Sequence, residues 1–367
     1  MQIDFANLKI QHNLYKEEIE EAILKVARDC NFIMGSQIDE LERNLEKFTG
    51  SKYAISCSSG TDALLLAMMA LDIQPDDEII TTPFTFFATA ETIAFLKAKP
   101  VFVDIDEKTY NIDPKKIEEK ISSKTKAIIP VSLYGQPCDM DEINQIAKKY
   151  NLKVIVDGAQ SFGSTYKGIS DSNLGDISCT SFFPAKPLGC YGDGGALFTN
   201  DEKLADKIKS LRLHGQSIRY HHQYIGMGGR LDTIQAAVLN VKLKYYPKDL
   251  KLRQDVAAKY TQALNAKNIE TPFVKNDRTS AWAQYSIRVQ NRTELQTKLQ
   301  NLGIPTAVHY PMPLHVQECF KYLNLKEGDF PISEKVSKEI MSLPMNPYVS
   351  DEEIEFIVEN LAKELRC

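Results

Sequence analysis

The hydrophobic positions of the chain alternate between two patterns. Short apolar runs of strand length occur at 53–56, 78–82, 101–103, 127–131, 153–156, 178–183 and 196–199. Apolar residues at helical spacing occur at 16–29, 38–48, 63–71, 88–98, 114–121, 140–150 and 201–212. Continuous apolar strands separated by helices are typical of a mainly parallel sheet covered by helices on both faces. We therefore predict an α/β fold for this part of the chain.

The remaining third of the chain predicts a smaller domain. A long helix is expected to begin at Leu231 and to end near Tyr246, where Pro247 and a basic segment indicate a domain boundary. Beyond it, the pattern predicts a strand at 284–289 and helices at 252–264, 292–302, 333–340 and 351–364. We assign residues 1–247 to a large domain and residues 248–367 to a small α+β domain.

Composition excludes several classes of protein. Of the 367 residues, 43% are hydrophobic and 25% are charged, and no apolar run is long enough to span a bilayer. The N-terminus lacks the pattern of a secretion signal, so we expect a cytoplasmic protein with no membrane association. A net charge of −5 argues against a nucleic-acid partner. The seven cysteines show no metal-binding spacing, so we expect reduced thiols and no metal site.

Lys186 occupies an unusual position for a lysine. It follows the predicted buried strand 178–183, Pro184 and Pro187 interrupt regular structure on both sides, and glycines at 189, 192, 194 and 195 permit tight turns. A desolvated amine held there could form a Schiff base with a carbonyl cofactor, of which pyridoxal phosphate (PLP) is the commonest. The alternative is a solvated lysine in a surface turn.

A second motif reads strand, small-residue turn and helix start. After the strand at 53–56 comes Cys57-Ser-Ser-Gly60-Thr61-Asp62, followed by an apolar helical run. Unpaired amides at such a helix start, together with the hydroxyls of Ser59 and Thr61, suit a phosphate group. The alternative is an ordinary helix cap, in which Thr61 or Asp62 serves only the helix.

Two further candidates follow predicted strands. Asp157 comes directly after 153–156, where a buried carboxylate needs a partner, and the N–H of a pyridinium ring would serve. Phe86 follows 78–82 and could stack on such a ring. The alternatives are that Asp157 caps its own turn and that Phe86 belongs to the core.

A long polar segment, 214–230, precedes the long helix. It gathers Arg219, His221, His222 and Arg230 in an otherwise acidic chain, so we expect it to bind an anion. His309 and Tyr310 form a second candidate group. Loops of this length are usually functional, and the alternative is a flexible solvated loop.

Several of these segments together resemble one enzyme family. Ser58-Ser-Gly-Thr-Asp-Ala-Leu, Asp157-Gly-Ala-Gln160 and Ser181-Phe-Phe-Pro-Ala-Lys186-Pro-Leu-Gly-Cys-Tyr-Gly-Asp-Gly-Gly195 occur in the order and spacing of the DegT/DnrJ/EryC1/StrS sugar aminotransferases. Arg230-Leu-Asp-Thr-Ile-Gln-Ala-Ala and His309-Tyr-Pro-Met-Pro-Leu extend the likeness over essentially the whole chain. The resemblance implies an aspartate-aminotransferase-like fold (PLP fold type I) and a homodimer whose active sites lie between the subunits.

The resemblance also implies roles for individual residues. Lys186 would be the Schiff-base lysine and proton carrier, and Asp157 the partner of the pyridinium nitrogen. Around the cofactor, Phe86 would stack on the ring, Gln160 would bond the ring hydroxyl, and the phosphate would be held by Gly60, Thr61 and Ser181. Many members add an asparagine from the partner subunit to the phosphate, and here Gly228 stands at that position. The substrate would be bound by Arg230, His222, His309 and Tyr310.

The implied reaction moves an amino group from L-glutamate to a nucleotide-linked keto-sugar. Within the family, the likeness extends to the enzymes that aminate C3 of UDP-2-acetamido-2-deoxy-3-oxo-glucuronate for surface polysaccharides such as lipopolysaccharide. A dTDP-3-keto-6-deoxyhexose is the rival substrate. A PLP-dependent sugar dehydratase is a further alternative, although such relatives carry histidine where this chain has Lys186. A regulator that binds PLP without catalysis would need an effector segment, and none is visible.

Overall fold

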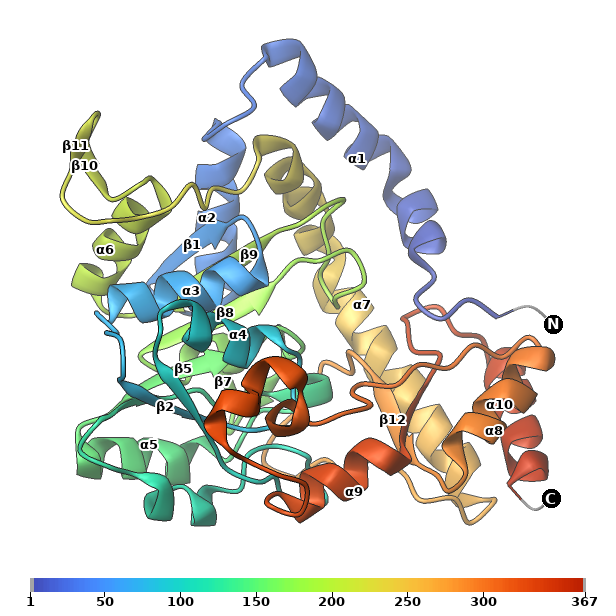
Figure 1. Ribbon diagram of the computed structural model, residues 1–367. Helices are drawn as coiled ribbons and strands as arrows, with labels where there is room; N and C mark the ends of the chain where they lie inside the picture. The colour runs from blue at the N-terminus through green and yellow to red at the C-terminus, as the bar shows by residue number, and fades with distance from the viewer. Residues whose placement is uncertain (1–2, 366–367) are drawn as a thin grey trace.

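A seven-stranded sheet forms the centre of the larger part of the computed structural model, which describes residues 3–365 (Figure 1). The strand order is β1-β9-β8-β5-β4-β2-β3. The strands are β1 (Tyr53–Cys57), β2 (Glu78–Thr81), β3 (Lys99–Phe102), β4 (Thr125–Ile128), β5 (Lys153–Asp157), β8 (Ile177–Ser181) and β9 (Gly195–Thr199). Strand β9 runs antiparallel to both of its neighbours, and the other pairings are parallel. The mainly parallel sheet predicted from the sequence is confirmed.

Helices cover both faces of this sheet, as the continuous apolar strands require. In β5, Ile155 packs into one apolar cluster while Val154 and Val156 pack into another on the opposite face, because successive strand residues point to opposite sides. The helices on the Ile155 side are α3 (Gly60–Ala70), α4 (Ala88–Phe95) and α6 (Glu202–Arg212). The other face is covered by α2 (Ser36–Thr49), α5 (Met140–Tyr150) and the first half of α7 (Thr233–Asn265).

Helix α7 corrects one prediction from the sequence. It continues through Pro247, so the expected helix end near Tyr246 and a separate helix at 252–264 are wrong. Proline removes one backbone donor and usually ends or kinks a helix. Here the buried face is apolar on both sides of the proline: Tyr246 packs under the sheet, whereas Tyr260 packs in the smaller core. Tertiary packing on both halves thus outweighs the local break.

Two other local predictions differ from the structure. The helix expected at 114–121 is a pair of short 3₁₀ turns, η1 (Pro114–Lys116) and η2 (Glu118–Lys120), in which Ile117 alone of this stretch is fully buried. One buried side chain gives too little apolar surface to support a full helix. Helix α1 (Leu8–Asp29) begins well before residue 16 and packs against α7.

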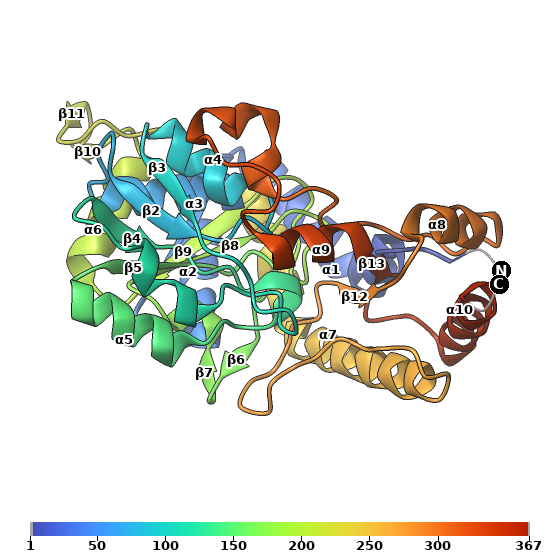
Figure 2. The same cartoon turned by 60° about the horizontal axis from the view of Figure 1, so that its bottom comes forward.

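A second core lies at the far end of α7. It joins the end of α7 to α8 (Arg292–Asn301), α10 (Asp351–Glu364) and the antiparallel pair β12 (Tyr285–Arg288) and β13 (Ile340–Leu343) (Figure 2). In the chain segment between α8 and β13, the turns η5 (Leu314–Val316) and η6 (Glu318–Leu323) pack against α4 and β3. Helix α9 (Pro331–Glu339) follows them. The division at residue 247 stays a prediction.

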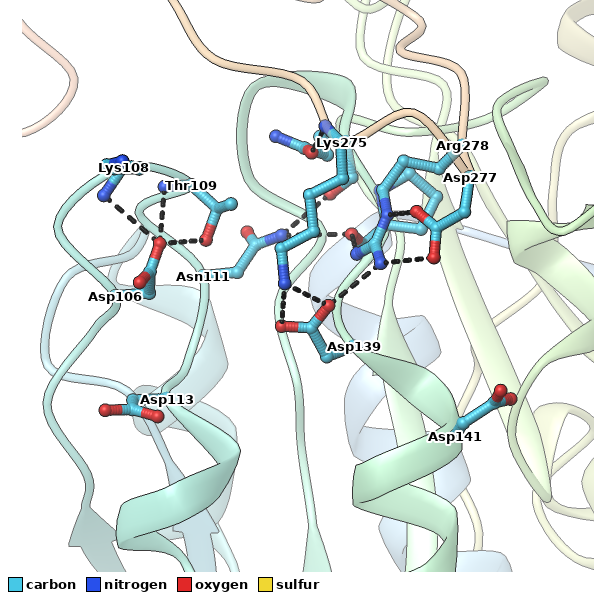
Figure 3. Close-up of polar contacts among 12 residues, drawn as sticks. Asp106, Lys108, Thr109, Asn111, Asp113, Asp139, Asp141, Lys275, Asp277 and Arg278 are labelled. Atoms are coloured by element: carbon cyan, nitrogen blue, oxygen red, sulfur yellow. Dashed lines mark hydrogen bonds and ion pairs between the residues drawn. The ribbon is translucent and has the colours of Figure 1, made fainter.

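Ion pairs fix the segment that returns from α7 to β12. Lys275 Nζ lies 2.7 Å from Asp139 Oδ1, and Arg278 Nη2 lies 2.8 Å from the same oxygen (Figure 3). Arg278 is 8% exposed and also donates to Asp277 and to Pro137 O, so its guanidinium is shared between two carboxylates and a carbonyl. This anchoring holds the residues just before β12 against the loops that follow β4.

Candidate functional site

A cavity of about 460 Å³ opens beyond the carboxyl ends of the central strands. Strands β5 and β8 end at Asp157 and Ser181, both in its wall. Nine of the residues expected from the sequence line it: Gly60, Thr61, Phe86, Asp157, Gln160, Ser181, Lys186, His309 and Tyr310. Residues far apart in the chain therefore meet in one site. In the described part of the chain, no cluster of His, Cys, Asp and Glu is placed to hold a metal ion.

Lys186 lies in a loop closed by backbone hydrogen bonds. Its amide donates to Phe183 O at 2.8 Å, and the amide of Cys190 donates to Phe182 O at 2.8 Å. Burial around the Lys186 amine lowers the pKa of its ammonium, while the charge of Asp157 acts in the opposite direction. The amine is thus desolvated, which disfavours the solvated surface turn and suits a nucleophile.

Lys242 of α7 contacts the loop that carries Lys186. This lysine of α7 is 3% exposed, and its Nζ donates to Gly189 O at 2.6 Å. It also lies 4.9 Å from the ring centroid of Tyr191. Burial lowers the pKa of Lys242 to about 8. Sequence reasoning missed this residue, because a lysine within a long helix gives no signal that its amine turns inward.

Asp157 is a buried carboxylate with neutral partners. It is 5% exposed, Thr89 Oγ1 donates to its Oδ2 at 2.7 Å, and the amide of Ala159 donates to its Oδ1 at 3.2 Å. Burial raises the pKa of Asp157, and Thr89, Ala159 and Lys186 oppose that rise. The Ala159 bond shows that Asp157 does cap its own turn. The carboxylate nevertheless faces the cavity, where a cationic N–H would offset its desolvation.

The start of α3 forms the other end of the cavity. Ser59 caps the helix, since its Oγ accepts from the amide of Asp62 at 3.0 Å, so the alternative of a cap by Thr61 or Asp62 is wrong. A Cβ on Gly60 would lie 2.6 Å from the Ser181 Cβ, so only glycine allows this close approach of helix and strand. The approach brings free helix amides and the Ser181 hydroxyl to one place, which suits a phosphate group.

The third wall comes from residues 309 and 310. Gln160 Nε2 donates to the Tyr310 hydroxyl at 3.0 Å, and Gln160 Oε1 accepts from the Tyr134 amide at 2.6 Å. His309 Nδ1 lies 2.9 Å from Ser342 Oγ. Burial lowers the pKa of His309 to about 4, with the Lys186 charge acting in the same direction. His309 is therefore a neutral hydrogen-bonding group near pH 7.

Phe86 lies at the rim of the cavity. Its side chain is 54% exposed, and its ring centroid is 5.9 Å from that of Tyr310. The alternative that Phe86 belongs to the core is therefore wrong. An exposed aromatic ring beside a cavity is available to cover a flat ligand.

The structure does not bring the loop residues to this cavity within one chain. His222 is exposed on β11 (His221–His222), which pairs with β10 (Gln216–Ile218) in a hairpin that projects from the body (Figure 1). Gly228 is exposed and bridges to Leu213. Arg230 has a buried Nε without a hydrogen-bond partner in the described part of the chain.

Gln284 is another residue that sequence reasoning missed. It precedes β12 and lines the cavity, and its buried Oε1 has no hydrogen-bond partner among residues 3–365. An orphaned acceptor in a ligand cavity suits a polar group of the ligand. The sequence around it reads only as the start of a strand.

The donor set fits PLP. A buried carboxylate is placed for the ring nitrogen, a desolvated lysine for the aldehyde carbon, and a helix start with a serine hydroxyl for the phosphate. These features lie in one cavity, and Gly60 allows the close approach of α3 to Ser181 that brings the donors of the phosphate end together.

Comparison with known proteins agrees with this geometry. The model of the DegT/DnrJ/EryC1/StrS aminotransferase family matches residues 13–362. The chain is 50% identical to the UDP-2-acetamido-2-deoxy-3-oxo-D-glucuronate aminotransferase of Pseudomonas aeruginosa, over 97% of this chain and 98% of that one. It is 43% identical to the dTDP-3-amino-3,6-dideoxy-alpha-D-galactopyranose transaminase of Aneurinibacillus thermoaerophilus, over 97% and 98%.

A solved structure is also similar to this chain over its whole length. The structure of NtdA from Bacillus subtilis with the cofactor PMP bound superposes with a TM-score of 0.92 at 31% identity, over 100% of this chain and 86% of that one. The aspartate-aminotransferase-like fold expected from the sequence is confirmed. The chain belongs to the DegT/DnrJ/EryC1/StrS aminotransferase family and is a PLP-dependent sugar aminotransferase.

Proposed function

We propose that this enzyme transfers an amino group from L-glutamate to C3 of UDP-2-acetamido-2-deoxy-3-oxo-D-glucuronate, on the way to a surface polysaccharide such as lipopolysaccharide. The observation that carries this choice is the 50% identity, over nearly the whole chain, with the Pseudomonas aeruginosa enzyme of that name. A location in the cytoplasm stays a prediction from the sequence.

The residues of the cavity supply distinct parts of the chemistry. Bound PLP provides an electron sink for the carbon that loses or gains the amino group. Asp157 accepts the ring N–H and keeps that nitrogen protonated, while Lys186 moves the proton between cofactor and substrate carbons. Gly60, Thr61 and Ser181 hold the phosphate, and Phe86 covers the ring. Gln160 bonds the ring hydroxyl, with Tyr310 fixing the amide of Gln160.

We propose that the active site is completed by a second copy of the chain. Exposed apolar residues are spread along α1 and the segment that follows it: Leu8, Ile10, Leu14, Leu24, Phe32, Ile33 and Met34. Large apolar side chains left exposed in this number on one helix and the segment after it favour association. The projecting loop 214–230 would then deliver His222, Gly228 and Arg230 to the partner's cavity. The amide of Gly228 would take the place of the family's asparagine at the phosphate, since the amide of Gly229 already donates to Arg212 O at 3.0 Å.

Arg230 is the residue we assign to the anionic groups of the sugar nucleotide. Its Nε is buried and unpaired in the described chain, and a guanidinium binds carboxylate or phosphate through paired hydrogen bonds. His309 and Tyr310 would contact the reacting end of the sugar, since both lie in the wall beside Lys186.

The decisive experiment compares two keto-sugars. With glutamate as donor, kcat/KM should be higher for the UDP-linked uronate than for a dTDP-3-keto-6-deoxyhexose, which lacks the carboxylate. Arg230→Lys should reduce this preference because it keeps charge but loses the forked geometry, while Arg43→Lys at an exposed position of α2 serves as the control. Equal or better use of the 6-deoxy sugar would overturn the uronate assignment and leave the aminotransferase intact.

A further inference from the structure

A second buried carboxylate, Asp171, lies next to the turn that follows Asp157. Asp171 begins the turn η4 (Asp171–Asn173), before β8, and is 1% exposed. It does not line the cavity, and neither the proposed reaction nor the sequence pattern assigns it a role. A Cβ placed on Gly158 would lie 3.1 Å from Asp171 Oδ2, so this carboxylate packs directly against the turn that carries Asp157.

Asp171 joins two loops of the active site. Ser132 Oγ donates to its Oδ1 at 3.0 Å, and Ser161 Oγ donates to its Oδ2. Ser161 follows Gln160 directly in the turn that carries Asp157. Ser132 lies between Val131, which lines the cavity, and the η3 turn (Leu133–Gly135). Both serines are fully buried. The carboxylate is therefore a clamp between the ends of β4 and β5.

The backbone connects the same parts. The amide of Ser132 donates to Asp157 O at 3.0 Å, the amide of Asp157 donates to Pro130 O at 2.9 Å, and the amide of Ser161 donates to Gly158 O at 3.1 Å. A shift of Asp171 would thus be transmitted to the position of Asp157 through short, buried contacts.

A neutral side chain could form such a clamp at lower cost. Burying a carboxylate without a cation is expensive, and Asp171 makes no ion pair within the described residues. The charged groups that act on it are Asp157 and Arg278, and Arg278 is already bound to Asp139 and Asp277. Burial, reinforced by the Asp157 charge, raises the pKa of Asp171 to about 6, which leaves it mostly ionised above neutral pH.

We propose that Asp171 is a positioning residue whose charge, added to that of Asp157, favours a protonated ring nitrogen on the cofactor. Two carboxylates on one side of a ring N–H stabilise its cationic form more than one does. The serine hydroxyls hold the second charge at a fixed place without neutralising it. This inference rests on the proposed role of Asp157.

The test separates charge from shape with two ligands. Affinities of the cofactor-free full-length protein are measured for PLP and for 1-deaza-PLP, in which carbon replaces the ring nitrogen. Asp171→Asn should weaken PLP by about tenfold, the factor that matches one pKa unit of charge coupling, and should leave the deaza compound nearly unchanged. Asp249→Asn is the control, since Asp249 is equally buried but belongs to α7, where it accepts from Gln11 and Tyr15 of α1.

Each outcome decides the question. Equal weakening of both ligands, or weakening of neither, would overturn the proposal, because a purely structural clamp cannot sense the ring nitrogen. If Asp171→Asn does not fold, Ser161→Ala keeps the carboxylate, removes one donor to its charged form and should show the same selectivity at smaller size. A loss that is equal for both ligands in Ser161→Ala would also overturn it.

Asp157→Asn distinguishes this inference from its foundation. If Asp157→Asn does not discriminate between PLP and the deaza compound, the proposed role of Asp157 itself fails. If Asp157→Asn discriminates and Asp171→Asn does not, the role of Asp157 stands and only the inference about Asp171 is lost.

Discussion

The hydroxyl of Thr89 donates a 2.7 Å hydrogen bond to Oδ2 of Asp157, from the first turn of α4 to the end of β5. Thr89 is fully buried, so water cannot replace it. The bond stabilises the charged carboxylate and opposes the rise in the Asp157 pKa that burial causes. Thr89 therefore helps to keep an anion in place for the cofactor's ring nitrogen.

Thr89→Val should lower kcat by about tenfold, because a bond to a charged group contributes about 1.5–3 kcal/mol and its loss favours the neutral carboxyl. Thr92→Val is a matched control in the same helix: Thr92 is also buried, but its hydroxyl bonds to Ala88 O at 2.9 Å. Steady-state kinetics and thermal unfolding of both variants check this. A similar loss of activity in Thr92→Val would assign the effect to helix packing.

Lys186→Ala should abolish transamination and keep the fold, because the lysine lies in a loop rather than in a packed element. The purified enzyme should be yellow, and borohydride reduction followed by peptide mass spectrometry should place PLP on Lys186. The peptide that contains the buried Lys242 is the internal control and should remain unlabelled. Full turnover by Lys186→Ala would contradict the central assignment.

Lys242→Met should loosen the loop that carries Lys186 with only a small change in unfolding free energy. Losing the bond to Gly189 O costs about 1–3 kcal/mol, but removing a buried ammonium that has no carboxylate partner among residues 3–365 offsets that loss. Hydrogen exchange at residues 183–191 should speed up and kcat should fall. Lys244→Met, exposed two residues further on and paired with Glu18, is the control. Unchanged exchange in Lys242→Met would show that the loop holds itself.

A hybrid dimer tests the shared active site. Lys186→Ala and Arg230→Ala should each be inactive alone, whereas random mixing of the two should restore about a quarter of the wild-type activity. Half of the dimers are then hybrids, and each hybrid has one site with both residues intact. No recovery, although the mixture forms hybrid dimers by mass spectrometry, would mean that Arg230 serves the cavity of its own chain.

The lowered pKa of His309 should make the fold less stable in acid. Its pKa in the folded chain is lowered to about 4 from 6.5, so below pH 6.5 the unfolded chain takes up a proton that the folded chain does not. Stability should therefore fall as the pH drops from 6.5 towards 4, by about 2–3 kcal/mol from this group.

His309→Gln should flatten that part of the stability profile, and His221→Gln on the exposed strand β11 should leave it unchanged. Urea unfolding of the three proteins at several pH values provides the comparison. Parallel profiles for the wild type and His309→Gln would show that the pKa of His309 is the same in the folded and unfolded chains.

The local signals in the sequence identified the parts of the site that chemistry restricts most. Lys186 between two prolines, Asp157 after an apolar strand and Gly60 at a helix start all stand where backbone geometry and residue type agree. Parallel strands place their carboxyl ends at one edge, so the meeting of these residues in one cavity follows from strand and helix order.

Other features depended on contacts between distant segments. The passage of α7 through Pro247, the cap at Ser59 and the inward turn of Lys242 each result from packing that local propensity does not contain. The same holds for Asp171, which meets Ser132 and Ser161 only after three strands have assembled. The sequence by itself determined the order of elements and the reactive residues, because hydrophobic periodicity and turn chemistry are local. The tertiary structure alone decided which buried polar groups share a hydrogen bond, because that depends on the distances between elements once they have packed.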